Sequence, residues 1–133
     1  MKIYETRMAP NPRRVRIFLT EKGISDVEYV ELDIQKGENL AKEFRAKNPL
    51  AKVPVLELDD GTCLSETVAI CRYFEVQHAD RPLMGVSALE QAHIEMWNRR
   101  MELSFFFPVA MAFRHTSGYF ADREDVHKAW GES

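Results

Sequence analysis

Cysteine is scarce in this sequence, which has only Cys63 and Cys71 among its 133 residues. Two cysteines cannot form the disulfide framework of a small secreted domain, and their spacing is not that of a CxxC redox pair. The four histidines are scattered, and none has a Cys or His partner at the spacing of a metal site. The sequence therefore predicts reduced thiols and no metal site.

Long apolar runs are also missing. The longest covers residues 105–113, whereas a helix that spans a bilayer needs about 20 apolar residues. No apolar segment of the signal-peptide kind follows the first residues. A net charge of −3 gives no overall field that favours nucleic acid or an anionic membrane. We therefore expect a cytoplasmic protein that binds neither nucleic acid nor membrane.

The first part of the chain alternates between strand-like and helix-like segments. Hydrophobic periodicity and turn residues predict strands over 2–5, 27–32, 53–58 and 63–64, and helices over 12–22, 37–48 and from 65 onward. Pro12 fits the first position of its helix, and Gly23 is a natural stop for it. The order βαβα-ββα predicts an α/β domain over residues 1–78, with helices on both faces of a small sheet.

The character of the chain changes after residue 78. Residues 79–87 have the composition of a linker, and residues 88–112 form a long helical pattern that Pro108 should kink or divide. The aromatic side chains of this segment are too many to bury against one small sheet, although each full burial contributes about 1.5–3 kcal/mol. We therefore expect residues 88–133 to be an incomplete all-α C-terminal domain, covered by another chain or by further helices.

Three short stretches carry the functional signal: residues 9–16, 48–56 and 64–70. In this order and at this spacing they resemble the N-terminal domain of the glutathione S-transferase family. The resemblance is strong over residues 1–78 and weaker through the helix over 97–113. It implies a thioredoxin-like fold, a homodimer, and glutathione as a co-substrate with no cofactor. It also implies a small hydrophobic electrophile or a peroxide as the second substrate.

Members of this family carry further helices beyond the equivalent of residue 133. We therefore expect the chain to be a fragment or truncated form, with a naturally short protein as the alternative.

Five residues are candidates for binding glutathione, a tripeptide with two carboxylates, an ammonium group and a peptide-like cysteinyl unit. The resemblance implies a cis bond between Val53 and Pro54, which would leave the Val53 backbone free to pair with an extended peptide at a strand edge. Ser65 and a helix start suit the γ-glutamyl carboxylate, Glu66 suits the ammonium, and Lys52 suits the glycyl carboxylate. Simpler roles stay open: a helix N-cap, a first-turn carboxylate, a surface lysine and a trans proline.

The group that activates the thiol is harder to identify. A free thiol has a pKa of about 8.5, so a transferase must stabilise the thiolate. Tyr4 lies too early, inside the first strand, Ala9 stands where many relatives have a serine, and Thr6 is a weak second choice. Asn11 is the best candidate, because its amide can donate to sulfur, and its Pro-Asn turn resembles that of the nu-class and related bacterial transferases. An ordinary turn residue is the alternative.

By family analogy, the apolar co-substrate would contact Trp97, Arg100, Met101 and Phe105, although the aromatic side chains could equally be core or interface residues. The sequence thus favours a glutathione transferase that attacks an electrophile or reduces a peroxide or disulfide. A catalytically weak binding or scaffolding module of the same fold is the alternative, favoured by Ala9. A dithiol reductase is disfavoured, because residues 11–13 stand where its CxxC would be.

Overall fold

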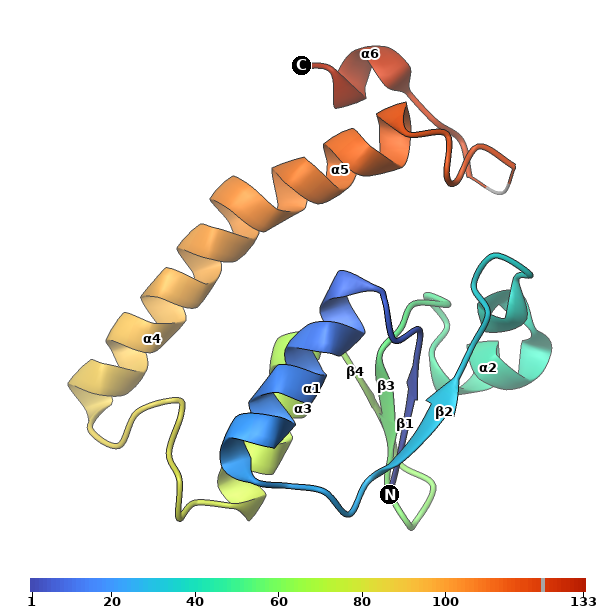
Figure 1. Cartoon of the computed structure of the whole chain (residues 1–133). Helices are drawn as coiled ribbons and strands as arrows, with labels where there is room; N and C mark the ends of the chain where they lie inside the picture. The colour runs from blue at the N-terminus through green and yellow to red at the C-terminus, as the bar shows by residue number, and fades with distance from the viewer. Residues whose placement is uncertain (123) are drawn as a thin grey trace. The chain divides into compact units, whose positions relative to one another are not determined.

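The computed structural model of the chain describes residues 1–122 and 124–133. They form two compact units, Met1–Leu83 and Met84–Ser133. We keep as predictions the domain limits expected from the sequence, which are residues 1–78, 79–87 and 88–133. The first unit contains, in order, β1 (Lys2–Glu5), α1 (Pro10–Lys22), β2 (Glu28–Glu31), the 3₁₀ turn η1 (Glu38–Leu40), α2 (Lys42–Lys47), β3 (Val55–Glu57), β4 (Cys63–Ser65) and α3 (Thr67–Gln77) (Figure 1).

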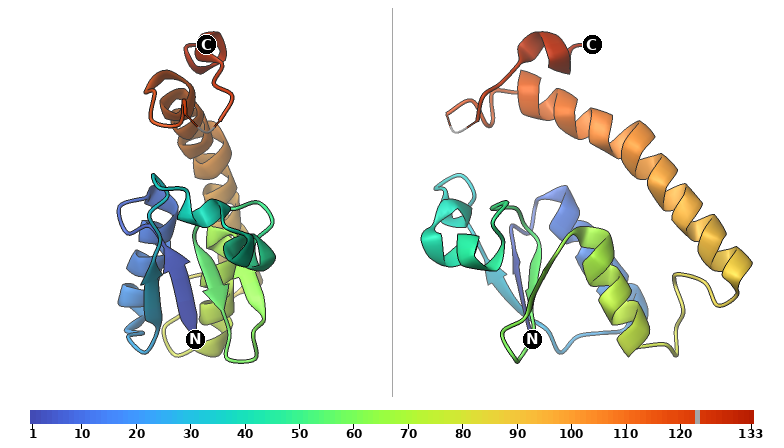
Figure 2. Two further views of the ribbon diagram at one scale, coloured as in Figure 1. Left: turned by 90° about the vertical axis from the view of Figure 1, so that its right-hand side faces the viewer. Right: turned by 180° about the vertical axis from the view of Figure 1, so that it is seen from behind.

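A four-stranded sheet forms the centre of the first unit, with strand order β2-β1-β3-β4. β1 is parallel to β2, and β3 is antiparallel to both β1 and β4. α1 and α3 cover one face of this sheet and α2 covers the other (Figure 2). The predicted α/β order with helices on both faces is therefore confirmed.

Side chains of β1 alternate between the two layers of the core. Tyr4 faces α2, where its ring lies 6.0 Å from that of Phe44 in an edge-on contact. Ile3 and Glu5 point to the opposite face, and both are fully buried. The core on that side is completed by side chains at most 1% exposed, among them Val15, Leu19, Leu56, Ile70 and Phe74.

The limits of all three helices predicted in the first unit differ from those observed, and α3 begins at Thr67 rather than at residue 65. α1 begins at Pro10 rather than Pro12, because both prolines fit a first turn whose N–H groups have no partner inside the helix. Gly23 ends it in the left-handed region, as predicted, at φ 72°. The helix predicted over 37–48 is divided by Ala41, whose extended backbone separates η1 from α2.

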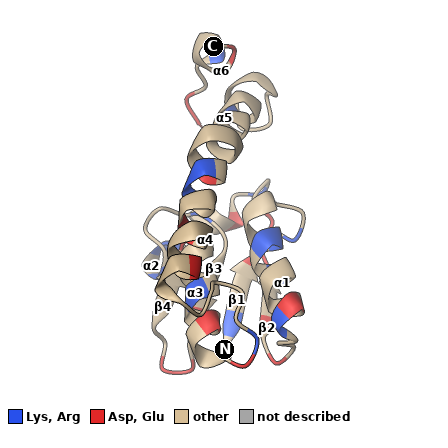
Figure 3. Cartoon of the chain, turned by 90° about the vertical axis from the view of Figure 1, so that its left-hand side faces the viewer, with Lys and Arg blue, Asp and Glu red and all other residues tan. Residues whose placement is uncertain are grey.

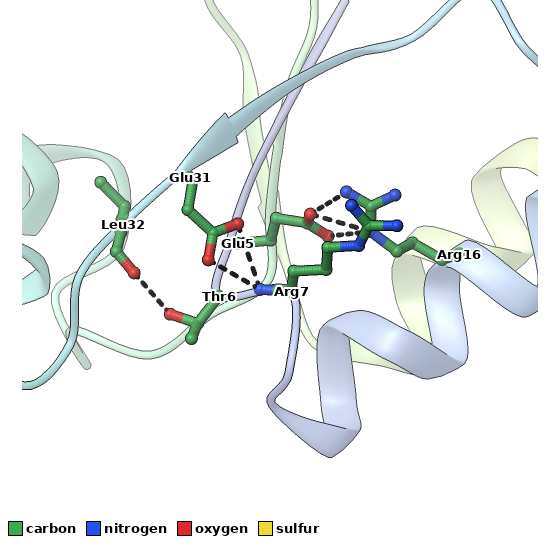
Figure 4. A network of polar contacts seen from close by, with 6 residues as sticks. All are labelled: Glu5, Thr6, Arg7, Arg16, Glu31 and Leu32. Carbon is green, nitrogen blue, oxygen red and sulfur yellow. Dashed lines mark hydrogen bonds and ion pairs between the residues drawn. The ribbon is translucent and has the colours of Figure 1, made fainter.

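A buried carboxylate ties β1 to α1 (Figure 4). The Glu5 side chain is 0% exposed and forms an ion pair with Arg16. The Arg16 Nε donates to both carboxylate oxygens at 2.8 Å, and the guanidinium also lies 3.9 Å from the centre of the Tyr29 ring. The pair therefore joins α1, β1 and β2 at one place.

The segment that follows β1 is held on β2 by two further hydrogen bonds (Figure 4). The Thr6 hydroxyl donates to the Leu32 carbonyl at 2.7 Å, and the Arg7 N–H donates to the Glu31 carboxylate at 3.0 Å. These two bonds therefore fix the position of the first residues of the loop that leads into α1.

The second unit contains α4 (Ala88–Met101), a π-helical segment η2 (Glu102–Phe106), α5 (Phe107–Thr116) and α6 (Lys128–Gly131). A capping box between Ser87 and Glu90 begins α4 at the expected residue. The α-helical pattern of the long helix is interrupted in the turn before Pro108, where η2 is π-helical, while the backbone stays helical from α4 into α5. Proline has no N–H for the carbonyl four residues earlier, so one regular α-helical hydrogen bond is missing in this turn.

Apolar side chains of the second unit are widely exposed. Of the described residues after Met84, none is buried. Large side chains that are at least half exposed include Trp97, Met101, Phe105, Phe107 and Phe113. The expected surplus of apolar surface is therefore confirmed. None of the helices in the described part of the chain is long and apolar enough to cross a bilayer.

Replacement of Arg16 tests the buried pair. The Arg16→Met variant leaves the Glu5 carboxylate buried without its counter-ion, so we expect the free energy of unfolding to fall by about 3 kcal/mol. Urea unfolding followed by circular dichroism measures the change. The exposed Arg13 gives the control, since Arg13→Met should cost less than about 0.5 kcal/mol. Equal losses in the two variants would contradict a stabilising role for the pair.

Candidate functional site

The three sequence stretches singled out above meet at one end of the sheet. Tyr4 of β1 is paired with Val55 of β3, and Val55 is paired with Ser65 of β4. Because β3 runs antiparallel to both neighbours, the end of β1, the start of β3 and the end of β4 lie side by side. The loop into α1, the loop before β3 and the turn into α3 therefore leave the sheet together.

The loop before β3 contains the cis Val53–Pro54 bond that the resemblance implies. Pro54 is buried, Val53 is half-buried, and Lys52 is exposed. The Val53 N–H and C=O make none of the backbone hydrogen bonds that join elements of the described chain. One expectation is wrong: β3 is an interior strand and offers no edge, because β1 and β4 occupy both of its sides. Next to β3, the described chain has unpaired backbone groups at Val53, in the loop ahead of the strand.

The turn into α3 has an unusual backbone. Ser65 is the last residue of β4, and α3 begins at Thr67. The suggestion that Ser65 is the N-cap is therefore wrong, as is a first-turn position for Glu66. Glu66 itself is the N-cap residue, at φ 72° and ψ 123°, and its side chain makes no capping bond. Such a left-handed conformation costs a non-glycine residue about 1–3 kcal/mol and is most often kept at functional sites.

Asn11 lies in the first turn of α1 and is half-buried. The Arg14 Nη1 donates to its Oδ1 at 3.4 Å. Since the carboxamide oxygen accepts this bond, the Nδ2 hydrogens are directed elsewhere and can donate to another group.

The backbone at the start of α1 offers one donor. Pro10 and Pro12 have no N–H, and the Arg13 N–H is bonded to the Ala9 carbonyl at 3.2 Å. Within the described residues no partner is seen for the Asn11 N–H. Both the backbone and the side chain of this residue can therefore donate at the positive end of the α1 dipole.

Tyr4 is engaged on the α2 face and is not a free donor. Its hydroxyl donates to the Glu57 Oε2 at 2.6 Å, and the Lys47 Nζ donates to the same oxygen at 2.8 Å. The hydrogen bond to Glu57 raises the pKa of Tyr4, and that from Lys47 lowers the pKa of Glu57. The phenol therefore stays protonated at neutral pH, which agrees with its exclusion as the thiol-activating group.

Both cysteines are free thiols, as expected. Burial raises the pKa of Cys71 to about 11 and also raises that of Cys63. Neither side chain is therefore predominantly a thiolate at neutral pH.

Two asparagines that the sequence patterns did not single out support the loop before β3. The Asn48 Nδ2 donates to the Lys52 carbonyl at 2.8 Å, and its Oδ1 accepts the Leu50 N–H at 3.1 Å. The Asn39 Nδ2 donates to the Ala51 carbonyl at 2.7 Å. The pair Asn-Pro at 48–49 reads from sequence only as the end of a helix. No periodicity indicates that its side chain turns back onto the loop.

The residues expected to contact the apolar co-substrate lie in the second unit. Trp97 and Met101 lie on one face of α4 with His93, Ile94 and Asn98, beside a shallow and largely open depression. The Arg100 guanidinium lies 5.2 Å from the centre of the Trp97 ring, and Phe105 belongs to η2. Two of the four candidates therefore share one exposed helix face.

Charge is mixed over the described chain. Lys and Arg share α1, α3 and α4 with Asp and Glu (Figure 3). Among the described residues, no group of three or more His, Cys, Asp or Glu side chains could hold a metal ion.

Comparison with known proteins gives the family. The model of the glutathione S-transferase N-terminal domain matches residues 3–82. Glutathione S-transferase 2 of Saccharomyces cerevisiae is 41% identical over 134 residues, which cover 98% of this chain and 58% of that protein. Elongation factor 1-gamma 2 of Oryza sativa is 50% identical over 60 residues, which are 45% of this chain and 14% of that protein.

Solved structures agree over nearly the whole chain. A glutathione S-transferase domain-containing protein from Marinobacter aquaeolei is 46% identical with a TM-score of 0.94, and the match covers 99% of this chain and 66% of that one. Gtt2 from Saccharomyces cerevisiae is 43% identical with a TM-score of 0.92, covering 99% and 65%. The fold is thus the thioredoxin-like fold of these proteins followed by helices, and the chain belongs to the glutathione S-transferase family.

Proposed function

We propose that the chain binds glutathione and stabilises its thiolate, either for attack on an electrophile or for reduction of a peroxide or disulfide. The observation that carries this proposal is the meeting of three segments at one end of the sheet: the start of α1, the loop before β3 and the turn into α3. Each segment offers hydrogen-bonding or charged groups that suit one part of the tripeptide.

The tripeptide backbone would lie along the loop before β3. The Val53 N–H and C=O pair with the cysteinyl unit in the manner of a short added strand, beside the buried Pro54. The exposed Lys52, for which no ion-pair partner is found in the described chain, takes the glycyl carboxylate. The Ser65 hydroxyl takes the γ-glutamyl carboxylate at the start of α3. Glu66 takes the ammonium group.

The thiol would lie at the start of α1. Asn11 is the catalytic residue of this proposal, because its carboxamide and its backbone N–H can both donate to sulfur. A carboxamide cannot remove the proton, so the role of Asn11 is to stabilise the thiolate.

The second substrate is proposed to be a small hydrophobic electrophile or a peroxide. Trp97, Arg100, Met101 and Phe105 are the residues proposed to contact it. The chain spans 58% of the length of its relative from Saccharomyces cerevisiae, so the activity of the whole protein is part of this proposal. So are a homodimer, a cytoplasmic location, and glutathione as co-substrate without a further cofactor.

A second candidate function is a glutathione-binding or scaffolding module with weak catalysis. Two observations favour it: Ala9 stands where many relatives have a serine, and one of the similar proteins is named elongation factor 1-gamma 2. A domain of this sequence type therefore occurs in proteins that are not named transferases.

Calorimetric titration with glutathione tests the binding that both candidates share. We expect saturable binding, followed by turnover in a chlorodinitrobenzene or a cumene hydroperoxide assay. Binding without turnover in either assay would favour the module, and absence of binding to the folded chain would overturn both candidates.

The Asn11→Ala variant tests the thiolate contact. Without the carboxamide donor, the pKa of bound glutathione should rise by about one unit, which corresponds to about 1.4 kcal/mol. Thiolate absorbance in the ultraviolet, followed against pH at saturating glutathione, measures the shift. Arg13→Ala in the same turn is the control and should leave the curve in place. An unmoved curve for Asn11→Ala would remove Asn11 from the mechanism.

The Glu66→Gly variant separates binding from folding. Glycine adopts the left-handed region readily, so relief of strain should offset its extra unfolded-state entropy and keep or raise the melting temperature. Loss of the carboxylate should weaken glutathione binding about tenfold, or about 1.4 kcal/mol. Glu66→Ala is the matched variant, which loses the same carboxylate while the strain stays. Unchanged affinity in both variants would rule out an ammonium contact.

A further inference from the structure

We propose that Asn48 is a positioning residue that sets the direction of the Val53 N–H before any ligand arrives. The inference rests on the proposed function, in which this N–H donates to the cysteinyl unit of glutathione. It concerns a side chain that contacts no substrate and acts only through the backbone of the loop before β3.

One planar peptide group links the Lys52 carbonyl to the Val53 N–H. The Lys52 carbonyl and the Val53 N–H belong to the same peptide, which is trans. In a planar trans peptide the C=O and N–H bonds point in opposite directions. The Asn48 Nδ2 holds the Lys52 oxygen at 2.8 Å. Fixing the oxygen on the Asn48 side therefore turns the Val53 N–H away from it, toward the side where no protein partner is found among the described residues.

Asn48 is a rigid anchor because all its polar groups are used and the residue is only 3% exposed. Its N–H donates to the Phe44 carbonyl of α2 at 2.9 Å, and its carbonyl accepts the Ala51 N–H at 2.9 Å. Its Oδ1 accepts the Leu50 N–H at 3.1 Å. The side chain can therefore rotate only if its two hydrogen bonds, one to the Lys52 carbonyl and one from the Leu50 N–H, both break.

The preceding peptide is held in the same way. The Asn39 Nδ2 bonds the Ala51 carbonyl at 2.7 Å, and Ala51 has a left-handed backbone at φ 54°. Two successive carbonyls, those of Ala51 and Lys52, are thus each bound by an asparagine carboxamide. This arrangement holds a short loop in a conformation that alanine rarely adopts, and its result is a fixed backbone at Val53.

Loss of the Asn48 bond should affect glutathione binding and thiol ionisation differently. A donor that is fixed in advance spares the ligand the entropic cost of ordering the loop. Loss of the Asn48 bond should therefore weaken glutathione binding and raise KM. It should leave the pKa of the bound thiol unchanged at saturation, because the proposed contacts to sulfur come from α1.

Asn48→Asp is the sharpest variant, since it keeps the shape and the acceptor for Leu50 but removes the donor to Lys52. Phe44→Leu, a change at a buried side chain of α2, the helix that Asn48 caps, is the matched control for local loss of packing. The direction of the Val53 N–H is measured in the ligand-free chain by residual dipolar couplings. Glutathione affinity is measured by calorimetry. We expect Asn48→Asp to change the Val53 coupling and to weaken binding at least tenfold, and Phe44→Leu to do neither.

Asn48→Ser gives the same comparison if the aspartate variant does not fold, because its shorter side chain does not reach the Lys52 carbonyl. An unchanged Val53 coupling in a folded Asn48 variant would overturn the inference, and so would affinity equal to that of Phe44→Leu. A wild-type chain that binds no glutathione would overturn the proposed function instead. The couplings of the ligand-free variants would still decide whether Asn48 directs the Val53 N–H.

Discussion

The antiparallel pairing of β1 with β3 is the constraint on which the rest of the first unit depends. It brings the end of one strand beside the start of the other, so the loops at residues 6–9 and 49–54 leave the sheet at one place. β4 continues the pattern and adds the turn at Glu66. Two of the proposed donors, the N–H groups of Val53 and Asn11, are backbone groups that need no side chain to reach a ligand at this end of the sheet. The price of the arrangement is the unusual backbone of Ala51 and Glu66.

Buried polar contacts in the core of the first unit hold these loops in position. The ion pair of Glu5 and Arg16 joins the end of β1 to the middle of α1. Farther along, the Lys22 Nζ bonds the Glu75 carboxylate at 2.7 Å and the Arg81 carbonyl at 2.6 Å, and so holds together α1, α3 and the segment after α3. A buried charge is stable only with such partners. These contacts therefore restrict α1 to one placement on the sheet, and with it the direction of its amino end.

The sequence was sufficient to predict the order of elements and the stop at Gly23, because periodicity and turn residues act locally. It was not sufficient for features set by tertiary contacts. The interior position of β3 depends on which strands pair, and the start of α3 at Thr67 depends on the register of β4. The role of Asn48 depends on a side chain that turns back onto its own loop. An interruption of the long helix near Pro108 could be predicted from the sequence, because it depends only on the missing proline N–H.

The group proposed to contact sulfur, the Asn11 carboxamide, does not titrate, so its capacity to favour a thiolate can be compared in free energy with what ionisation requires. To lower a thiol pKa from about 8.5 to neutrality requires about 2 kcal/mol. A hydrogen bond to a charged group contributes about 1.5–3 kcal/mol, and a helix dipole adds about 0.3–1 kcal/mol. One good donor from Asn11 at the start of α1 is therefore enough, and a hydroxyl at Ala9 is not required. A site built on amides needs its donors aimed in advance, because an amide, unlike a hydroxyl, cannot rotate its hydrogen toward a displaced ligand.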